Sequence, residues 1–226
     1  MKRNRLAVLG GAAILLASSL LASTPTASAV TIVRESLLTM IRALPVAAAS
    51  HASTYNRTSE FGDWTYHSEP YGHCNTRAVV LTQESKIPVT RTATTCTVRT
   101  GRWVSIYNGK TYTYAYGGTY LQIDHLIPVE NAWISGAWAW TQARRIAFYN
   151  DLGDYRSLNA VDTASNEAKG DKTPAAWLPA IGHCRYIEYW AAVKTRWSLK
   201  VTSAEKSALL RDAAGCGNPT MTVARA

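Results

Sequence analysis

The sequence places an acidic residue directly before a histidine, where a short apolar stretch ends. Asp124 and His125 follow the residues LQI (121–123) and precede LIP (126–128). If the stretch is a strand, neighbouring side chains point to opposite faces, so the two groups can have separate roles. An imidazole takes up protons near neutral pH, and a carboxylate can bind a metal ion. This pair is therefore the first candidate for a catalytic site.

A second polar segment follows downstream, where residues 163–172 read TASNEAKGDK. A short helix there would present Asn166 as a neutral oxygen ligand, with Lys169 adding positive charge. One carboxylate and one amide leave coordination positions for water and phosphate oxygens, which suits Mg²⁺, with Mn²⁺ as the alternative. Phosphodiester hydrolysis needs a base, a metal and cationic groups. We therefore expect Asp124 and Asn166 to bind the metal and His125 to be the general base.

The remaining pattern predicts the elements that must position these groups. Helical spacing or composition predicts helices over residues 31–44, 76–84, 129–149, 163–170, 181–197 and 203–214. Thr202 and Glu205 have the spacing of a capping box at the start of the last helix. Alternation over residues 92–120, with Asn108-Gly109 as a turn dipeptide, predicts a strand-rich meander, and residues 158–161 predict a short strand. Without a repeat or linker, we expect one α+β domain.

The first residues are typical of a secretory signal peptide. Lys2, Arg3 and Arg5 precede an apolar stretch, and the small residues ASA (27–29) follow it. This order of regions predicts cleavage before Val30, with an uncleaved membrane anchor as the alternative. The protein is therefore expected to be secreted, without stable membrane association after cleavage.

Composition and charge narrow the class of protein. The chain has 226 residues, of which 47% are hydrophobic, as in ordinary globular proteins, and its one long apolar run lies at the N-terminus. A polytopic membrane protein is thereby excluded. Cleavage of residues 1–29 removes three of the 24 basic residues and none of the 15 acidic residues, which leaves an excess of six positive charges. That excess favours polyanions such as nucleic acid.

Four cysteines all lie in the exported part of the chain, at positions 74, 96, 184 and 216. An even number of cysteines in an oxidising compartment predicts two disulfides, with three possible pairings. The pairs Cys74–Cys96 and Cys184–Cys216 are favoured because they close two local loops of similar size. A zinc site is the alternative, since a histidine precedes both Cys74 and Cys184, although no Cys-x-x-Cys spacing is present.

Several stretches together resemble the secreted HNH endonuclease family common in actinomycetes, which is related to the C-terminal nuclease domain of GmrSD-type restriction enzymes. The matching stretches are CNTRAVVL (74–81), IDHLIPVENAWISGAWAW (123–140), RRIAFYND (144–151) and SNEAKGDKTPAAWLP (165–179). Asn75 departs from the family's commoner Cys-Asp-Thr-Arg, which puts activity and metal preference in doubt if that acid shapes the site.

The resemblance implies a ββα-metal (His-Me) finger in a mostly helical, disulfide-stapled single domain with a small β meander. In this arrangement Asp124 and Asn166 are metal ligands and His125 is the general base. Asn150 is the first choice for the residue that orients the imidazole, with Asn159 as the alternative. Arg145 and Lys169 are candidates for contacts with substrate phosphate. The domain limits expected are the signal peptide (1–29), an N-terminal helix and covering segment (30–73), and the HNH nuclease domain (74–226).

The function expected from the sequence is a secreted, monomeric, metal-dependent endonuclease that hydrolyses DNA, with RNA as a second possible substrate. No recognition helix pattern is evident, so binding would depend mainly on phosphates and show little sequence specificity. The alternative is a non-catalytic extracellular protein that uses the same scaffold to bind polyanions or envelope polymers. A hydrolase of another class has no support, because Gly-x-Ser-x-Gly and His-Glu-x-x-His are absent from the sequence.

Overall fold

The computed structural model describes residues 30–92, 95–115 and 121–226. The predicted signal peptide (1–29) and parts of the predicted meander (93–94 and 116–120) lie outside the described residues. The helices are α1 (Leu37–Ala43), η1 (Ala52–Thr54), α2 (Arg57–Phe61), α3 (Thr76–Glu84), α4 (Val129–Ile134), η2 (Ala137–Ala139), α5 (Gln142–Tyr149), α6 (Thr163–Lys169), α7 (His183–Arg196) and α8 (Ser203–Ala213). The strands are β1 (Ile32–Ser36), β2 (Thr90–Arg91), β3 (Val98–Val104), β4 (Thr111–Tyr114), β5 (Leu121–His125), β6 (Leu158–Asp162) and β7 (Thr220–Ala224).

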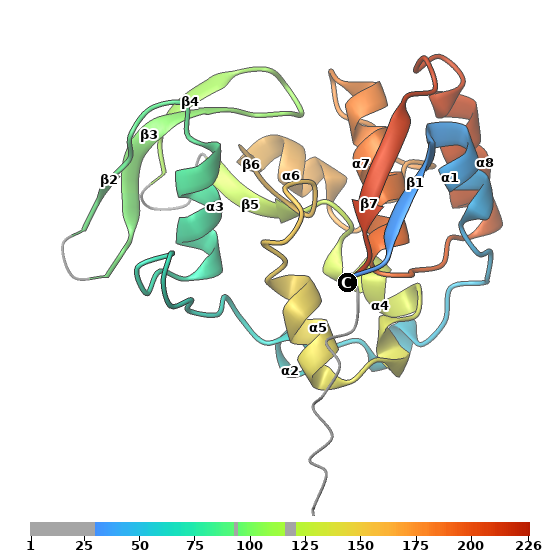
Figure 1. Cartoon of the computed structure of the whole chain (residues 1–226), viewed down its shortest axis with the longest axis horizontal. Coiled ribbons are helices and arrows are strands. Elements are labelled where there is room, and N and C mark those ends of the chain that lie inside the picture. The colour runs from blue at the N-terminus through green and yellow to red at the C-terminus, as the bar shows by residue number, and fades with distance from the viewer. Residues whose placement is uncertain (1–29, 93–94, 116–120) are drawn as a thin grey trace, which may run out of the picture.

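A two-stranded antiparallel sheet, β5 with β6, lies in the middle of the molecule, and α6 follows β6 directly (Figure 1). The register pairs Asp124 with Asn159 and His125 with Leu158. Apolar side chains of this sheet enter two separate hydrophobic clusters: Leu121 belongs to the smaller one and Val161 to the larger one. Because packed side chains hold the sheet from both clusters, the end of β5 is a rigid position for polar groups.

The N-terminal segment differs from the prediction of one helix over residues 31–44. Residues 32–36 form β1, which pairs with β7 near the C-terminus, and only residues 37–43 are helical. Ser36 ends the strand and caps α1, since its Oγ accepts a hydrogen bond from the Thr39 amide. The helix prediction was wrong in its first half because the partner strand is distant in sequence, and β-branched Ile32 and Val33 suit a paired strand.

The predicted meander is present as the sheet β2–β3–β4, and α3 packs against it. Asn75 caps α3, because its Oδ1 accepts a hydrogen bond from the Ala78 amide at 3.0 Å. An aspartate would cap a helix in the same way, so Asn75 preserves this structural role. Trp103 of β3 donates its indole hydrogen to the Leu81 carbonyl at 2.8 Å, and Cys74 and Cys96 form a disulfide nearby.

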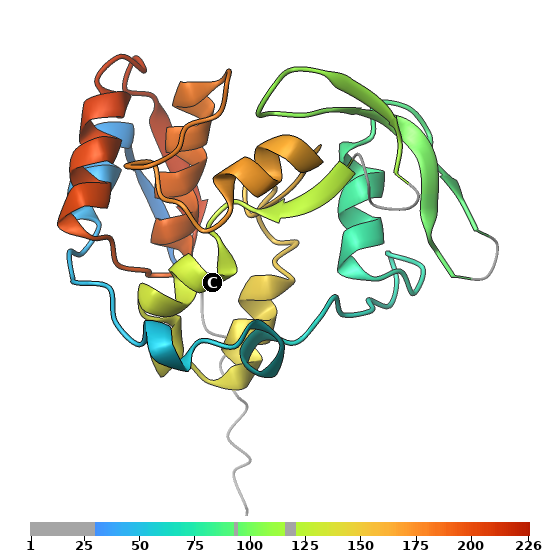
Figure 2. The same ribbon diagram turned by 180° about the vertical axis from the view of Figure 1, so that it is seen from behind.

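On the other side of the central sheet, α1, α7 and α8 pack together around the β1–β7 ribbon (Figures 1 and 2). The capping box at Thr202 and Glu205 is confirmed, with the hydrogen bonds to both backbone amides. Cys184 and Cys216 form the second disulfide. Both predicted pairings are therefore confirmed, and the bonded sulfurs leave no thiolate to bind zinc.

The chain is thus a mixed α/β single domain with two disulfides. The segment 30–73 belongs to the same body, because β1 pairs with β7 and Phe61 of α2 is fully buried. Among the helices of the described residues, none combines the length and apolar character that a membrane crossing requires.

Candidate functional site

The end of β5, the helix α6 and the start of α4 enclose a pocket of about 180 Å³, which we call the site pocket. Its lining residues come from three segments distant in sequence: Arg57; Ile123, Asp124, His125, Pro128 and Val129; and Asn166 and Gly170. Three of the predicted site residues, Asp124, His125 and Asn166, therefore line the same pocket. The pocket also contains one residue, Arg57, that the sequence did not suggest.

Asp124 is buried and both of its carboxylate oxygens are engaged. Oδ1 accepts a hydrogen bond from the Lys169 ammonium at 2.7 Å, and Oδ2 accepts one from the Tyr107 hydroxyl at 2.5 Å. Lys169 is fully buried and also donates to the His125 carbonyl at 2.9 Å. Burial lowers the pKa of Lys169, and the adjacent Asp124 charge opposes this effect. The pair is thus a buried ion pair at the base of the site pocket.

His125 is held by a main-chain group and by aromatic rings. Its Nε2 lies 2.8 Å from the Tyr149 carbonyl oxygen. Because a carbonyl only accepts hydrogen bonds, Nε2 carries the hydrogen in this contact and Nδ1 is the unprotonated nitrogen of the neutral ring. Trp64 stacks on the imidazole with centroids 5.2 Å apart and an angle of 5° between the planes.

The environment keeps His125 neutral. Burial is the largest cause that lowers its pKa, to about 3, and the positive charges of Arg57 and Lys169 act in the same direction. The hydrogen bond with Tyr149 opposes the shift. His125 is therefore neutral throughout the neutral pH range, and a pKa so far below 7 makes it a weaker base than a free imidazole.

Asn166 lies on α6, which begins and ends as the sequence predicts. The Asp162 carboxylate accepts a hydrogen bond from the Ser165 amide at 2.8 Å, and Gly170 ends the helix with a φ of 51°. The Asn166 Nδ2 donates to Gln122 Oε1 at 2.6 Å. Within the described residues, Asn166 Oδ1 accepts no hydrogen bond, which leaves a neutral oxygen ligand at the site pocket.

The structure does not support the predicted role of Asn150. Its Oδ1 accepts hydrogen bonds from the Thr65 amide at 2.9 Å and from the Thr76 hydroxyl at 2.5 Å, so the side chain connects other segments. The main-chain carbonyl of the preceding residue, Tyr149, contacts His125 instead. The alternative, Asn159, donates to the Arg156 carbonyl at 3.1 Å and is buried. Neither amide contacts the imidazole in the described part of the chain.

The two predicted phosphate contacts have structural partners. Arg145 forms an ion pair with Glu60 at 2.8 Å and donates to the Glu60, Ala137 and Trp140 carbonyls. Lys169 is paired with Asp124, and its side chain is only 1% exposed. Both cations therefore hold the scaffold: Lys169 is buried, and the partly exposed Arg145 is already paired with Glu60.

Sequence reasoning missed Arg57, Trp64, Tyr107 and Tyr149, all of which line or support the site pocket. Arg57 comes from the five-residue helix α2, which has no periodic pattern of its own. The one available signal was the helix cap, because Asn56 precedes Arg57 and accepts a hydrogen bond from the Ser59 amide. The aromatic residues were not distinguishable from ordinary core residues by spacing.

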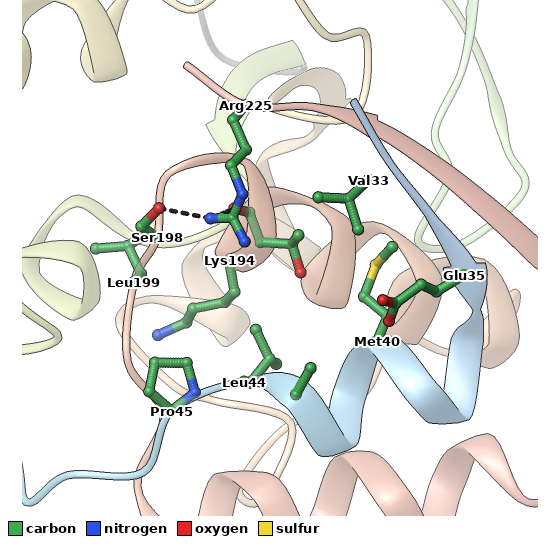
Figure 3. Close-up of a pocket in the computed structure, with 11 residues that line it drawn as sticks. Val33, Glu35, Met40, Leu44, Pro45, Lys194, Ser198, Leu199 and Arg225 are labelled. Carbon is green, nitrogen blue, oxygen red and sulfur yellow. Dashed lines mark hydrogen bonds between the residues drawn. The ribbon is translucent and has the colours of Figure 1, made fainter. Parts of the chain in front are cut away.

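A second pocket, of about 240 Å³, lies between the β1–β7 ribbon, α1 and the end of α7 (Figure 3). Apolar side chains such as Met40 and Leu199 line it together with Glu35 and Arg225. The Arg225 guanidinium donates to Ser198 Oγ at 2.7 Å. None of the predicted site residues lines this pocket, so we keep the site pocket as the candidate functional site.

The described residues contain no group of three or more His, Cys, Asp or Glu side chains placed to bind a metal ion.

Comparison with known proteins finds a fungal relative. The chain is 41% identical over 141 residues to an "Uncharacterized secreted protein" of Arthroderma benhamiae, and the match covers 61% of this chain and 66% of the relative. The chain thus spans slightly less than two thirds of the relative's length. No protein family model matches the chain. No solved structure matches it either.

These findings correct the resemblance to a secreted actinomycete HNH endonuclease family. That assignment is wrong, because no family model matches the chain and the relative found is fungal, with a name that carries no activity. The prediction of secretion is confirmed: the protein is secreted, as its relative is, and its two disulfides are consistent with the extracellular space.

Proposed function

We propose that this secreted protein is a metal-dependent endonuclease that hydrolyses phosphodiester bonds of DNA at the site pocket, with RNA as a second substrate to be tested. The observation that supports this proposal is that Asp124, His125 and Asn166, from two segments distant in sequence, line one pocket. A neutral base, a carboxylate, an amide oxygen and an exposed guanidinium are the groups that this hydrolysis uses.

The donor set suits a hard divalent cation such as Mg²⁺ or Mn²⁺. Asp124 offers a carboxylate, and Asn166 offers an amide oxygen whose orientation is fixed by the contact of Nδ2 with Gln122. Lys169 and Tyr107 use part of the Asp124 carboxylate, but a carboxylate has about four lone-pair sites. When bound, such a cation supplies stabilisation of the charge that develops on phosphate oxygens.

His125 receives a proton from the attacking water at Nδ1, because Nε2 donates its hydrogen to the Tyr149 carbonyl. The stacked Trp64 ring fixes the plane of the imidazole. A negatively charged phosphodiester in the site pocket offsets the fields of Arg57 and Lys169, which lower the pKa of His125. Substrate binding therefore makes the imidazole a stronger base at the moment when it is needed.

We further propose that β5, β6 and α6 act as a ββα metal-binding unit. Two consecutive antiparallel strands and the helix that follows them carry the proposed base and both proposed ligands. Asp124 and His125 come from the first strand and Asn166 comes from the helix.

The test is cleavage of supercoiled plasmid by the mature protein with Mg²⁺ or Mn²⁺, compared with EDTA. We expect nicking and linearisation by the parent and a loss of at least about 100-fold in His125→Ala, because general-base catalysis contributes about that much. His183→Ala is the matched control, since His183 Nε2 also contacts a main-chain carbonyl, that of Pro179 at 2.8 Å, but lies outside the site pocket. Equal cleavage by parent and His125→Ala would refute the proposal.

A non-catalytic polyanion-binding protein is the second candidate. The specific observation in its favour is that the Lys169 ammonium already neutralises Asp124 at 2.7 Å. In that case calorimetry would detect no binding of Mg²⁺ or Mn²⁺, and the protein would bind duplex DNA without cleaving it.

A further inference from the structure

We propose that Arg57, from the N-terminal segment, is the residue that binds a phosphate group in the site pocket, and that Tyr149 positions its guanidinium. The inference rests on the proposed function for the identity of the anion as a substrate phosphate. It adds a phosphate-binding residue outside the sheet and helix that carry Asp124, His125 and Asn166.

The first observation is the charge balance of the site pocket. Of the described residues that line it, Arg57 is the one cation, and it is exposed. Within the described residues, Arg57 forms no ion pair with a carboxylate, whereas Arg145 and Lys169 do. An exposed guanidinium without a carboxylate partner has donors left for an anion, and its planar fork matches two phosphate oxygens.

The second observation is that the guanidinium is held in place. Arg57 Nη2 donates to the Tyr149 hydroxyl at 3.0 Å, and its central carbon lies 5.2 Å from the centroid of the Tyr149 ring. Tyr149 is itself buried, and its carbonyl contacts His125 Nε2. One residue therefore fixes the proposed base through its main chain and the proposed phosphate ligand through its side chain.

The third observation concerns α2, the helix that carries Arg57. Arg145 of α5 joins α2 through the ion pair with Glu60 and a hydrogen bond to the Glu60 carbonyl at 3.1 Å. Phe61, at the end of α2, is fully buried. Figure 2 shows α2 beside α5, below the central sheet. Arg145, which the sequence suggested as a phosphate contact, thus anchors the helix that presents Arg57.

The experiment is a titration of the ¹⁵N-labelled mature protein with inorganic phosphate at constant ionic strength, followed at the amides of His125, Asn166 and Gly170. We expect a saturable shift in the parent and an affinity about 10-fold lower or more in Arg57→Gln, because a hydrogen-bonded charge is lost. Tyr149→Phe keeps the carbonyl and the ring, so it should weaken binding by less, about 3-fold. Arg34→Gln, at an exposed position of β1 outside the site pocket, is the matched control and should bind as the parent does.

A second measurement uses duplex DNA. In the non-cleaving His125→Ala background, Arg57→Gln should reduce the slope of log affinity against log salt concentration by about 0.9, the loss of one phosphate contact. Retention of the amide spectrum away from the site pocket shows that each variant is folded. An Arg57→Gln variant that binds phosphate as tightly as the parent, or a parent without saturable shifts at these amides, would overturn the inference.

The outcomes separate the inference from the proposed function. Phosphate binding that depends on Arg57, without any plasmid cleavage by the parent, would leave the anion site standing and refute the nuclease. Cleavage that depends on His125, with phosphate binding unchanged in Arg57→Gln, would refute the anion site alone.

Discussion

The buried ion pair between Lys169 and Asp124 permits a quantitative prediction for Lys169→Met. Methionine has a similar volume and no charge, so the substitution leaves the Asp124 carboxylate buried, with the Tyr107 hydroxyl as its remaining hydrogen-bond partner among the described residues. The side chains of Lys169 and Asp124 are only 1% and 5% exposed, so water screens their interaction poorly. Removal of one partner from a buried pair costs about 3–5 kcal/mol. We expect the free energy of unfolding to fall by that amount.

The assay is urea unfolding of the disulfide-intact protein at neutral pH in EDTA. With a slope of about 2 kcal/mol per M, the midpoint should fall by about 1.5–2.5 M. Lys172→Met is the control, because Lys172 is exposed and its ammonium donates, within the described residues, to the Ala168 carbonyl alone, so the substitution should change stability by less than about 0.5 kcal/mol. The double variant Asp124→Asn/Lys169→Met should lose much less than the sum of the single variants, since it removes both charges.

Two outcomes would refute this reasoning about Lys169. The first is a loss below about 1 kcal/mol for Lys169→Met, which would mean that the pair is not desolvated as its burial implies. The second is additivity in the double-mutant cycle, which would mean that the two charges do not interact.

Two further predictions concern stability. Burial raises the pKa of Glu84 from 4.5 to about 7, although its carboxylate accepts a hydrogen bond from the Ala160 amide. As pH rises, the unfolded chain loses the Glu84 proton before the folded chain does, which favours unfolding. The free energy of unfolding of the parent should therefore fall by about 2–3 kcal/mol relative to that of Glu84→Gln between pH 4.5 and 7. Urea unfolding across this pH range measures the difference between the two proteins, and a difference that does not change with pH would contradict the prediction. Arg145→Ala should cost about 2–3 kcal/mol because it removes the Glu60 ion pair and the carbonyl contacts. The partly exposed Arg144 makes one carbonyl contact and lies over Trp140, so Arg144→Ala should cost less, about 1 kcal/mol, in the same unfolding assay.

Local signals in the sequence account for the parts of the site that were predicted. The alternation that ends in Asp124 and His125 identified β5, and the terminating Gly170 identified α6. A capping residue interacts with groups within one helical turn, so the interacting residues are only three or four positions apart in the sequence. The capping box at Thr202 and Glu205 was predictable for the same reason.

The parts that were missed depend on contacts between distant segments. Strand β1 exists because β7 pairs with it, and helical spacing in residues 31–44 cannot reveal that partner. The group that orients His125 is a main-chain carbonyl, which every residue possesses, so side-chain types could not reveal it, and the family resemblance pointed to Asn150 instead. Arg57 reaches the site pocket through a contact with Tyr149, 92 positions away in the sequence.

The sequence also does not distinguish cations that hold the fold from cations that bind ligands, although Lys169 and Arg57 carry the same charge. Lys169 is fully buried against Asp124, so its removal should lower stability and leave the exposed guanidinium of Arg57 unchanged. Arg57 is exposed and makes its described side-chain hydrogen bond to an uncharged hydroxyl, so its removal should lower anion affinity at little cost in stability. Opposite effects of the two substitutions follow from burial alone. A protein in which both substitutions weakened phosphate binding equally would instead have a pocket governed by net charge, without a specific phosphate ligand.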